Sequence, residues 1–352
     1  MKLEVIKKEK TGKLPEGPLG FGKHFTDHMF VMEYAGGEWG KARIQPYAPF
    51  SLDPSTSVFH YGQAVFEGTK AYKNKAGEIR LFRPRDNLIR MNESCARICI
   101  PPVPVDFVLD ALKQLVLLDE AWIPTDEGTS LYIRPTVIAT ETALGVHAAH
   151  NYLFFIILSP SGAYYAHGLE PVRLYVEENY VRAARGGTGH HKVVGNYAAS
   201  LLAGEKAEKL GYDQVMWLDA KEHKYVEEVG SMNIFFVLDG KLLTPALMGS
   251  ILPGITRRSV LELAREHGMP VEEREIAIAE IVEGAKSGAL TEVFGTGTAA
   301  VISPVGDFGY KGEDYVVNGG KMGKVAKMFY DELTGIQTGR IPDTHGWSVR
   351  IK

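Results

Sequence analysis

The run from Tyr152 to Leu158 constrains the fold of this 352-residue chain more than any other stretch, because every residue in it is apolar. A membrane-spanning helix needs about 20 apolar residues, so the run is far too short to cross a bilayer. A strand this continuously apolar is buried on both faces. We therefore predict a central strand in a sheet that other layers cover.

Strand and helix periods alternate along the rest of the chain, which indicates a mixed α and β fold. Helical spacing follows Asp86 and recurs over 105–118 and 197–210, and a further helix opens at Pro253 and ends before Gly268. The predicted strands are 29–33, 41–46, 70–72, 79–82, 130–138, 152–158, 172–176, 213–218, 225–229, 233–238 and 241–243. A further strand within 292–300 enters a glycine-threonine turn, and the strand-like segment 301–304 follows it.

The length of the chain favours two domains, because 352 residues exceed what one hydrophobic core usually serves. The turn-rich segment 159–168 interrupts the regular pattern. We predict a smaller N-terminal α/β domain over 1–160, an interdomain loop over 161–180 and a larger C-terminal α/β domain over 181–352.

Composition and charge favour a soluble protein that acts on small molecules. The formal net charge is -4, and no run of Lys and Arg is dense enough for nucleic acid or a membrane surface. The N-terminus mixes acids with bases and lacks the apolar core of a signal peptide, so we expect a cytoplasmic location. The two cysteines, Cys95 and Cys99, are four residues apart on a predicted helix and are interpreted as buried core residues.

Lys192 is the candidate nucleophile. It lies between the glycine-rich turn 186–189 and the small-residue helix that begins near Tyr197, and no acid occurs from Thr188 to Leu202. Dry surroundings lower the pKa of a lysine and free its amine to attack a carbonyl. The alternative is a lysine at a helix start whose ammonium group reaches water.

Three features of the second half suit a phosphate-bearing cofactor that accepts electrons. Gly254–Thr256 opens a helix whose amides attract a phosphate, and Gly295–Thr298 offers close backbone approach and two hydroxyl groups. Each is otherwise an ordinary helix cap or tight turn. The pair Glu227-Glu228 begins a mainly apolar strand, where a carboxylate needs a cationic partner such as a protonated pyridine nitrogen. Alternation sends the two side chains to opposite faces, and we expect Glu227 to be the one in water.

Other motifs do not support an alternative chemistry. The glycines at 295 and 297 fit a loose dinucleotide fingerprint, but a strand that contains Pro304 follows them in place of a helix. No P-loop, zinc-type His-Glu-x-x-His or Gly-x-Ser-x-Gly motif occurs. No matching carboxylate or cysteine accompanies the histidines, which we interpret as structural, so we expect no metal: His147, His150, His190 and His191.

Seven motifs occur in order along the chain: Tyr61–Gly68, Leu81–Pro84, Ser130–Pro135, Lys192–Tyr197, Glu228–Asn233, Leu252–Gly254 and Phe294–Ala299. They resemble the motifs of the branched-chain-amino-acid aminotransferases, which are fold-type IV pyridoxal-phosphate enzymes. The likeness runs from about Phe59 to Ile336. The resemblance implies an α+β fold of two domains joined by a loop, and a homodimer.

The resemblance also implies roles for the cofactor-binding residues. Lys192 would carry pyridoxal 5′-phosphate and later move a proton between the substrate Cα and the cofactor, and Glu228 would hold the pyridine nitrogen protonated. Tyr197 would bond the phenolic oxygen of the cofactor. The phosphate would be bound by Arg90, Ile255, Thr256 and Thr298.

The implied substrates are L-leucine, L-isoleucine and L-valine, with 2-oxoglutarate as the amino-group acceptor in amino-acid biosynthesis. Tyr61 and the amides near Ala299 would bind the α-carboxylate, and Arg134 with Tyr132 would take the second carboxylate of glutamate. The side-chain pocket would be lined by Phe66, Tyr132, Tyr164 and Ser231.

Three alternatives stay open. Two keep the fold and the cofactor: a D-amino acid aminotransferase, and the lyase that releases pyruvate from aminodeoxychorismate. The third is a phosphate- or nucleotide-binding module built on the glycine turns, which would be colourless and would not depend on Lys192.

Overall fold

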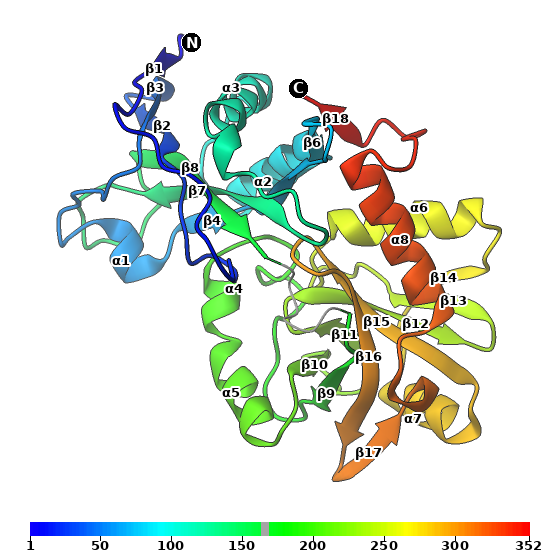
Figure 1. The fold of residues 1–352 in the computed structure, drawn as a ribbon. Coiled ribbons are helices and arrows are strands. Elements are labelled where there is room, and N and C mark those ends of the chain that lie inside the picture. Colours follow the sequence, from blue (N-terminus) through cyan, green and yellow to red (C-terminus); the bar gives the residue numbers. More distant parts are fainter. Residues whose placement is uncertain (163–168) are drawn as a thin grey trace. The chain divides into compact units, whose positions relative to one another are not determined.

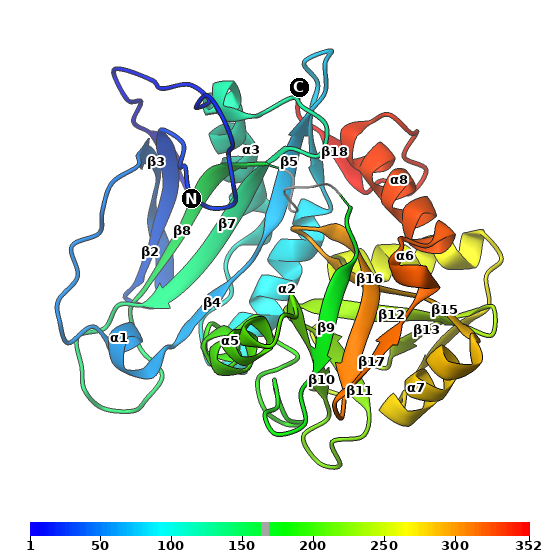
Figure 2. The same cartoon turned by 60° about the horizontal axis from the view of Figure 1, so that its bottom comes forward.

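The computed structural model describes residues 1–162 and 169–352, which form two compact units (Figures 1 and 2). Unit 1 holds the described residues up to 162 together with Lys192–Val194 and Gly335–Lys352. Unit 2 holds the described residues from 169 to His191 and Gly195–Thr334. The predicted α+β class is confirmed, since strands and helices mix in both units.

Unit 1 is built on a mostly antiparallel sheet in the order β1-β3-β2-β8-β7-β5-β6-β18, with β4 paired to β7. The strands are β1 (Glu4–Val5), β2 (His28–Ala35), β3 (Glu38–Pro46), β4 (Ala64–Phe66), β5 (Thr69–Lys73), β6 (Ile79–Phe82), β7 (Ser130–Ala139), β8 (Tyr152–Ser161) and β18 (Ser348–Arg350). The helices are α1 (Ser57–Tyr61), α2 (Pro84–Arg97), α3 (Val105–Leu118) and the short 3-10 turn η1 (Glu120–Trp122).

The central position of the run at 152–158 is confirmed, because β8 pairs with β2 on one side and β7 on the other. Alternate residues of β8, among them Phe154 and Ile156, join the apolar side chains of α2 and α3 in the main core of the unit. Leu153 on the opposite face joins a smaller cluster, and Phe155 and Ile157 beside it are half-buried. The two helices therefore cover one face of the sheet.

Unit 2 contains a closed ring of six strands in the order β11-β10-β9-β16-β15-β12, which closes because β12 also pairs with β11. The strands of the unit are β9 (Val172–Val176), β10 (Gln214–Leu218), β11 (Val226–Val229), β12 (Met232–Leu238), β13 (Lys241–Pro245), β14 (Val271–Arg274), β15 (Leu290–Gly297), β16 (Val301–Tyr310) and β17 (Glu313–Val316). Apolar side chains of these strands fill a second core.

The helices of unit 2 are α4 (Gly195–Ala198), α5 (Leu201–Lys209), α6 (Ile255–Glu266), α7 (Ile278–Ser287) and α8 (Lys324–Thr338), whose last residues belong to unit 1, with the 3-10 turn η2 (Asn318–Gly320). The single helix predicted over 197–210 is divided in two. The hydroxyl of Ser200 bonds the carbonyl of Tyr197 at 2.8 Å and competes with the helical bond at the division.

The prediction for the cysteines is half right. Cys95 lies on α2 and is fully buried, and this burial raises the pKa of its thiol to about 12. Cys99 lies beyond the end of α2 with a positive φ and is exposed. The helix ends at Arg97, so the spacing of four residues no longer places both cysteines on one face.

Candidate active site

In unit 1 Lys192 is joined to β4 and α2. Its carbonyl accepts a hydrogen bond from the Phe66 amide at 3.1 Å, and Val193 forms a bridge with Val65. The Lys192 amide donates to the Oγ of Ser94, a buried residue of α2, at 2.9 Å. Backbone contacts on both sides therefore hold the half-buried lysine beside the end of β4.

Four of the predicted residues form one cluster around Phe66. The Nζ of Lys192 lies 4.7 Å from the centroid of the Phe66 ring, and the Cζ of Arg134 lies 4.6 Å from the same centroid. Arg134 also donates from Nη2 to the Tyr132 hydroxyl at 3.0 Å. The cluster thus places an amine and a guanidinium group against one aromatic ring.

Two further residues lie beside this cluster: Phe21, which belongs to none of the seven motifs, and Gly68, the last residue of the motif Tyr61–Gly68. The ring of Phe21, in the N-terminal segment, meets the Tyr132 ring edge to face at 4.8 Å between centroids. A Cβ atom added to Gly68 would overlap the Tyr132 hydroxyl, so a glycine is required there. Helix or strand periodicity could not identify Phe21 as a neighbour of Tyr132, because Phe21 lies in a loop and the two residues are far apart in the sequence.

Arg90 is paired with Glu67 in the interior of unit 1. Its Nε and Nη2 atoms donate to the two oxygens of the Glu67 carboxylate at 2.7 and 2.8 Å. Arg90 is 6% exposed and Glu67 is 0% exposed. The charged guanidinium can be buried because the Glu67 carboxylate pairs with it.

Tyr61 lies at the end of α1 and is exposed, and its hydroxyl donates to the carbonyl of Leu144. The structure therefore does not place Tyr61 in the Phe66 cluster. Tyr164 lies outside the described residues.

In unit 2 the carboxylate of Glu228 is buried beside a cation. Arg182 forms an ion pair with it, the Leu252 amide donates to its Oε1 at 3.0 Å, and Nδ2 of Asn233 donates to the same atom at 3.2 Å. Burial raises the pKa of Glu228, and the charge of Arg182 opposes that rise. The sequence indicated that this acid needs a cationic partner but did not identify Arg182.

The prediction that Glu227 faces water is wrong. Glu227 is 7% exposed and accepts a hydrogen bond from the Ser250 hydroxyl. Its pKa is raised by burial, as for its neighbour. Both faces of β11 are buried because the strand is part of the closed ring.

The predicted phosphate-binding residues of unit 2 adjoin Glu228. α6 begins at Ile255, three residues after Leu252, and among the described residues no side chain caps its start at Gly254. Thr296 pairs in register with Asn233, and its buried Oγ1 has no hydrogen-bond partner within the described chain. Amides at a helix start and an unused buried hydroxyl group suit an anionic ligand.

The remaining predicted residues of unit 2 lie at turns and a short helix. Thr298 and Ala299 are half-buried in the turn between β15 and β16, and Ser231 is exposed in the turn between β11 and β12. Tyr197 is half-buried on α4. All four residues therefore lie outside the strands of the closed ring.

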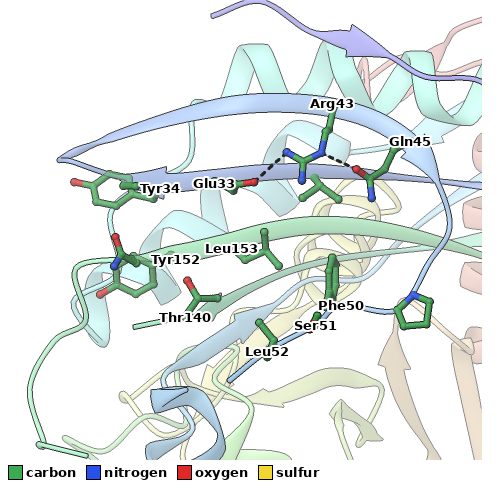
Figure 3. A pocket seen from close by; sticks show the side chains of 14 residues that line it. Glu33, Tyr34, Arg43, Gln45, Phe50, Ser51, Leu52, Thr140, Tyr152 and Leu153 are labelled. Carbon is green, nitrogen blue, oxygen red and sulfur yellow. Dashed lines mark hydrogen bonds and ion pairs between the residues drawn. The ribbon is translucent and has the colours of Figure 1, made fainter. Parts of the chain in front are cut away.

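A cavity of about 550 Å³ in unit 1 is separate from these residues. Figure 3 shows Arg43 between Glu33 and Gln45 on its wall, with bonds of 3.0 and 2.6 Å. None of the predicted site residues lines it. The cavity therefore has no part in the candidate site.

The reason for treating His147 and His150 as structural was also incorrect. Glu141 lies beside both rings, so a carboxylate does accompany these histidines.

A family model described as amino-transferase class IV matches residues 64–308, which include Lys192, Glu228 and the start of α6. The chain belongs to the class IV aminotransferase family. The matched residues cover more than half of the chain and extend through both units.

Relatives of this aminotransferase match along almost its whole length. Branched-chain-amino-acid transaminase 1 of Bacillus subtilis is 55% identical over 354 residues, which cover 99% of each chain. The branched-chain-amino-acid aminotransferase of Mycolicibacterium smegmatis is 48% identical over 94% of this chain and 92% of its own.

Solved structures show the same fold. The branched-chain amino acid aminotransferase of Escherichia coli matches with a TM-score of 0.77 and 30% identity over 93% of this chain and 99% of its own. The T.th. branched-chain amino acid aminotransferase with pyridoxamine 5′-phosphate matches with a TM-score of 0.76 and 27% identity, over 91% and 98%. The fold-type IV architecture is therefore confirmed.

The donors present in this aminotransferase fit the cofactor of its family, pyridoxal 5′-phosphate. Unit 2 offers a buried carboxylate for a pyridinium nitrogen and an uncapped helix start for a phosphate. Unit 1 offers an amine on a protected backbone segment.

Proposed function

We propose that this chain is a branched-chain-amino-acid aminotransferase. It transfers the amino group of L-leucine, L-isoleucine or L-valine to 2-oxoglutarate, reversibly, and yields branched-chain 2-oxo acids and L-glutamate. The observation that carries the proposal is the 55% identity to the Bacillus subtilis transaminase over 99% of both chains. At 55% identity we expect the two proteins to catalyse the same type of reaction and to line the substrate pocket with similar residues.

Pyridoxal phosphate, when bound, supplies a ring that withdraws electrons from the bonds at the substrate Cα. Lys192 carries the cofactor, and its Nζ takes the Cα proton and returns it. Glu228, paired with Arg182, holds a proton on the pyridine nitrogen. Tyr197 binds the phenolic oxygen.

The phosphate is assigned to four groups: the amides of Ile255 and Thr256 at the start of α6, Thr298, and Arg90. Supporting this, the start of α6 has no side-chain cap within the described chain. Glu67 fixes the plane of the Arg90 guanidinium through two hydrogen bonds, which suits recognition of a planar or tetrahedral anion.

The substrate side chain is assigned to Phe66, Tyr132, Tyr164 and Ser231, and the α-carboxylate to Tyr61 and Ala299. Phe66 and Tyr132 supply apolar surface, and Arg134 lies on both rings, where it can pair with the second carboxylate of glutamate. An apolar pocket separates substrates that differ by one methylene by only about 1–3 kcal/mol. One pocket can therefore serve all three branched substrates.

The assembly, the location and the domains complete the proposal. We expect a homodimer in the cytoplasm that serves amino-acid biosynthesis. Its domains, 1–160 and 181–352, are joined by the segment 161–180, within which Val172–Val176 form strand β9 in place of the predicted loop. No helix of the described chain has the length and apolar character to cross a membrane. Sedimentation and cell fractionation test the dimer and the location.

The test is a set of initial rates with 2-oxoglutarate and either L-leucine, D-alanine or aminodeoxychorismate. L-Leucine should be the good donor, and glutamate and the 2-oxo acid should form in equal amounts. A preference for D-alanine would support the D-specific relative, and release of pyruvate from aminodeoxychorismate would support the lyase. The Lys192→Ala variant should be inactive in every assay.

A further inference from the structure

Three side chains with metal-binding atoms meet on the connection between β7 and β8. None of the three is assigned to the proposed site, and the same connection contacts one residue of that site, because the Leu144 carbonyl accepts a hydrogen bond from Tyr61. They are Glu141, His147 and His150, and their ligand atoms all lie within 4.8 Å of one another. The Nε2 of His147 is 3.1 Å from Oε1 of Glu141, and the Nδ1 of His150 is 3.1 Å from Oε2. The carboxylate thus lies between two imidazole nitrogens.

The backbone holds this carboxylate in place. The His150 amide donates to Oε2 of Glu141 at 2.6 Å, and the Glu141 carbonyl accepts from the Ser57 amide at 2.8 Å. The neighbouring residue Thr142 forms a bridge with Thr56. A hydrogen-bonded, fixed carboxylate is typical of metal ligands, whose orientation depends on such support.

We propose that Glu141, His147 and His150 form a binding site for a divalent transition-metal ion, of which Zn²⁺ is the expected occupant. Zinc binds histidine nitrogen and carboxylate oxygen at about 2.0–2.2 Å, so ligand atoms roughly 3 Å apart can share one ion. Two imidazoles and one carboxylate favour zinc over magnesium or calcium, which prefer oxygen ligands.

Small side-chain movements complete the site. His150 is 81% exposed at its side chain and His147 is 43% exposed, so both rings can rotate toward a shared ion, and water can fill its fourth position. The bound ion would join the start of the connection at 141 to its end at 147 and 150. The segment between them, which includes the exposed Leu144 and Val146, would then lose mobility.

The experiment is calorimetric titration of ZnCl₂ into the holoenzyme in a phosphate-free buffer. We expect one zinc ion per chain, with affinity reduced about tenfold or more in both His147→Asn and Glu141→Gln. The matched control is His267→Gln, which removes an exposed histidine paired with the single carboxylate of Glu332. That control should bind zinc as the wild type does.

Hydrogen exchange gives a second measurement that does not depend on aminotransferase activity. Zinc should slow exchange over 142–149 in the wild type and leave it unchanged in Glu141→Gln. Circular dichroism should show both loop variants to be folded, because His147 is exposed and the half-buried Glu141 lies outside the hydrophobic core. Equal zinc affinity in the wild type and the two loop variants would place the ion elsewhere and overturn the proposal.

Discussion

The guanidinium of Arg182 lies against the buried carboxylate of Glu228. The two residues are 9% and 4% exposed at their side chains, so water screens the pair little. Glu228 would otherwise be protonated more readily, because burial alone raises its pKa. Arg182 is therefore the group that opposes the protonation of Glu228, the residue proposed to hold the pyridine nitrogen of the cofactor.

Replacing Arg182 by Met should weaken cofactor binding. The pKa of Glu228 rises further without its cation, and a protonated Glu228 no longer holds a proton on the pyridine nitrogen. The loss of one partner from a buried pair also lowers the free energy of unfolding by about 3–5 kcal/mol. Titration of the apoenzyme with pyridoxal phosphate, together with urea unfolding, measures both effects.

The control for this variant is Arg185→Met. Arg185 pairs with Glu275, but the two side chains are 51% and 45% exposed. Removing an exposed ion pair lowers the free energy of unfolding by only about 0–1 kcal/mol. Equal losses of pyridoxal phosphate affinity and of unfolding free energy in Arg182→Met and Arg185→Met would contradict the role given to Arg182.

Gly68→Ala should raise the KM for L-leucine more than it lowers kcat. The added Cβ overlaps the Tyr132 hydroxyl, and the displaced ring loses its bond to Arg134. Gly40→Ala is the control, because a Cβ there meets no atom within 4 Å. The overlap should also lower the free energy of unfolding of Gly68→Ala. Adding Tyr132→Phe removes the overlapping hydroxyl and should restore part of that free energy; no gain in the double variant would count against this explanation.

Lys70→Met should change the pH dependence of stability. Burial lowers the pKa of Lys70 to about 8 from 10.5, so the folded state binds fewer protons than the unfolded state between these values. Above pH 10.5 the amine of Lys70 is neutral in both states and its burial costs no charge. As the pH falls from 10.5 through about 8, the free energy of unfolding decreases, because the unfolded state takes up the proton first. At pH 7 the buried charge therefore costs up to about 3 kcal/mol.

Urea unfolding at pH 7, 9 and 10 measures this effect as the difference between the wild type and Lys70→Met. The variant should be more stable at pH 7, and the gain should shrink as the pH rises. Lys41→Met, at a side chain that is 75% exposed, should show no such trend. A gain that is constant with pH would contradict the lowered pKa.

Local patterns in the sequence predicted much of unit 1. The helix at Val105–Leu118 has the predicted bounds, because its apolar face repeats at helical spacing over its full length. The strand at Tyr152–Ser161 is central, as its composition required. Short strands without such a pattern were not predicted, among them β18, which pairs with β6.

Units 1 and 2 also differ from the predicted domains, because contacts between segments that are distant in the sequence decide which residues belong to each unit. Residues 335–352 group with unit 1 because β18 pairs with β6, a partner far away in the chain. Lys192–Val194 likewise group with unit 1 through Val65. A pattern along the chain gives no information about such long-range pairings.

The candidate site shows the same limit. The sequence singled out Lys192 and Glu228, since an isolated lysine and a strand acid are unusual locally. It gave no means of pairing Glu228 with Arg182, or Arg90 with Glu67, which are separated by other elements. The error at Glu227 arose because alternation predicts an open face, whereas β11 is part of a closed ring.

The most direct test of the central claim is the visible absorption spectrum of the purified protein with L-leucine, and with D-leucine as a control. The bound cofactor should give a visible band that L-leucine alone abolishes and 2-oxoglutarate restores, and Lys192→Ala should not show this cycle. A protein that gains no band after addition of pyridoxal phosphate, or whose band responds only to D-leucine, would contradict the account.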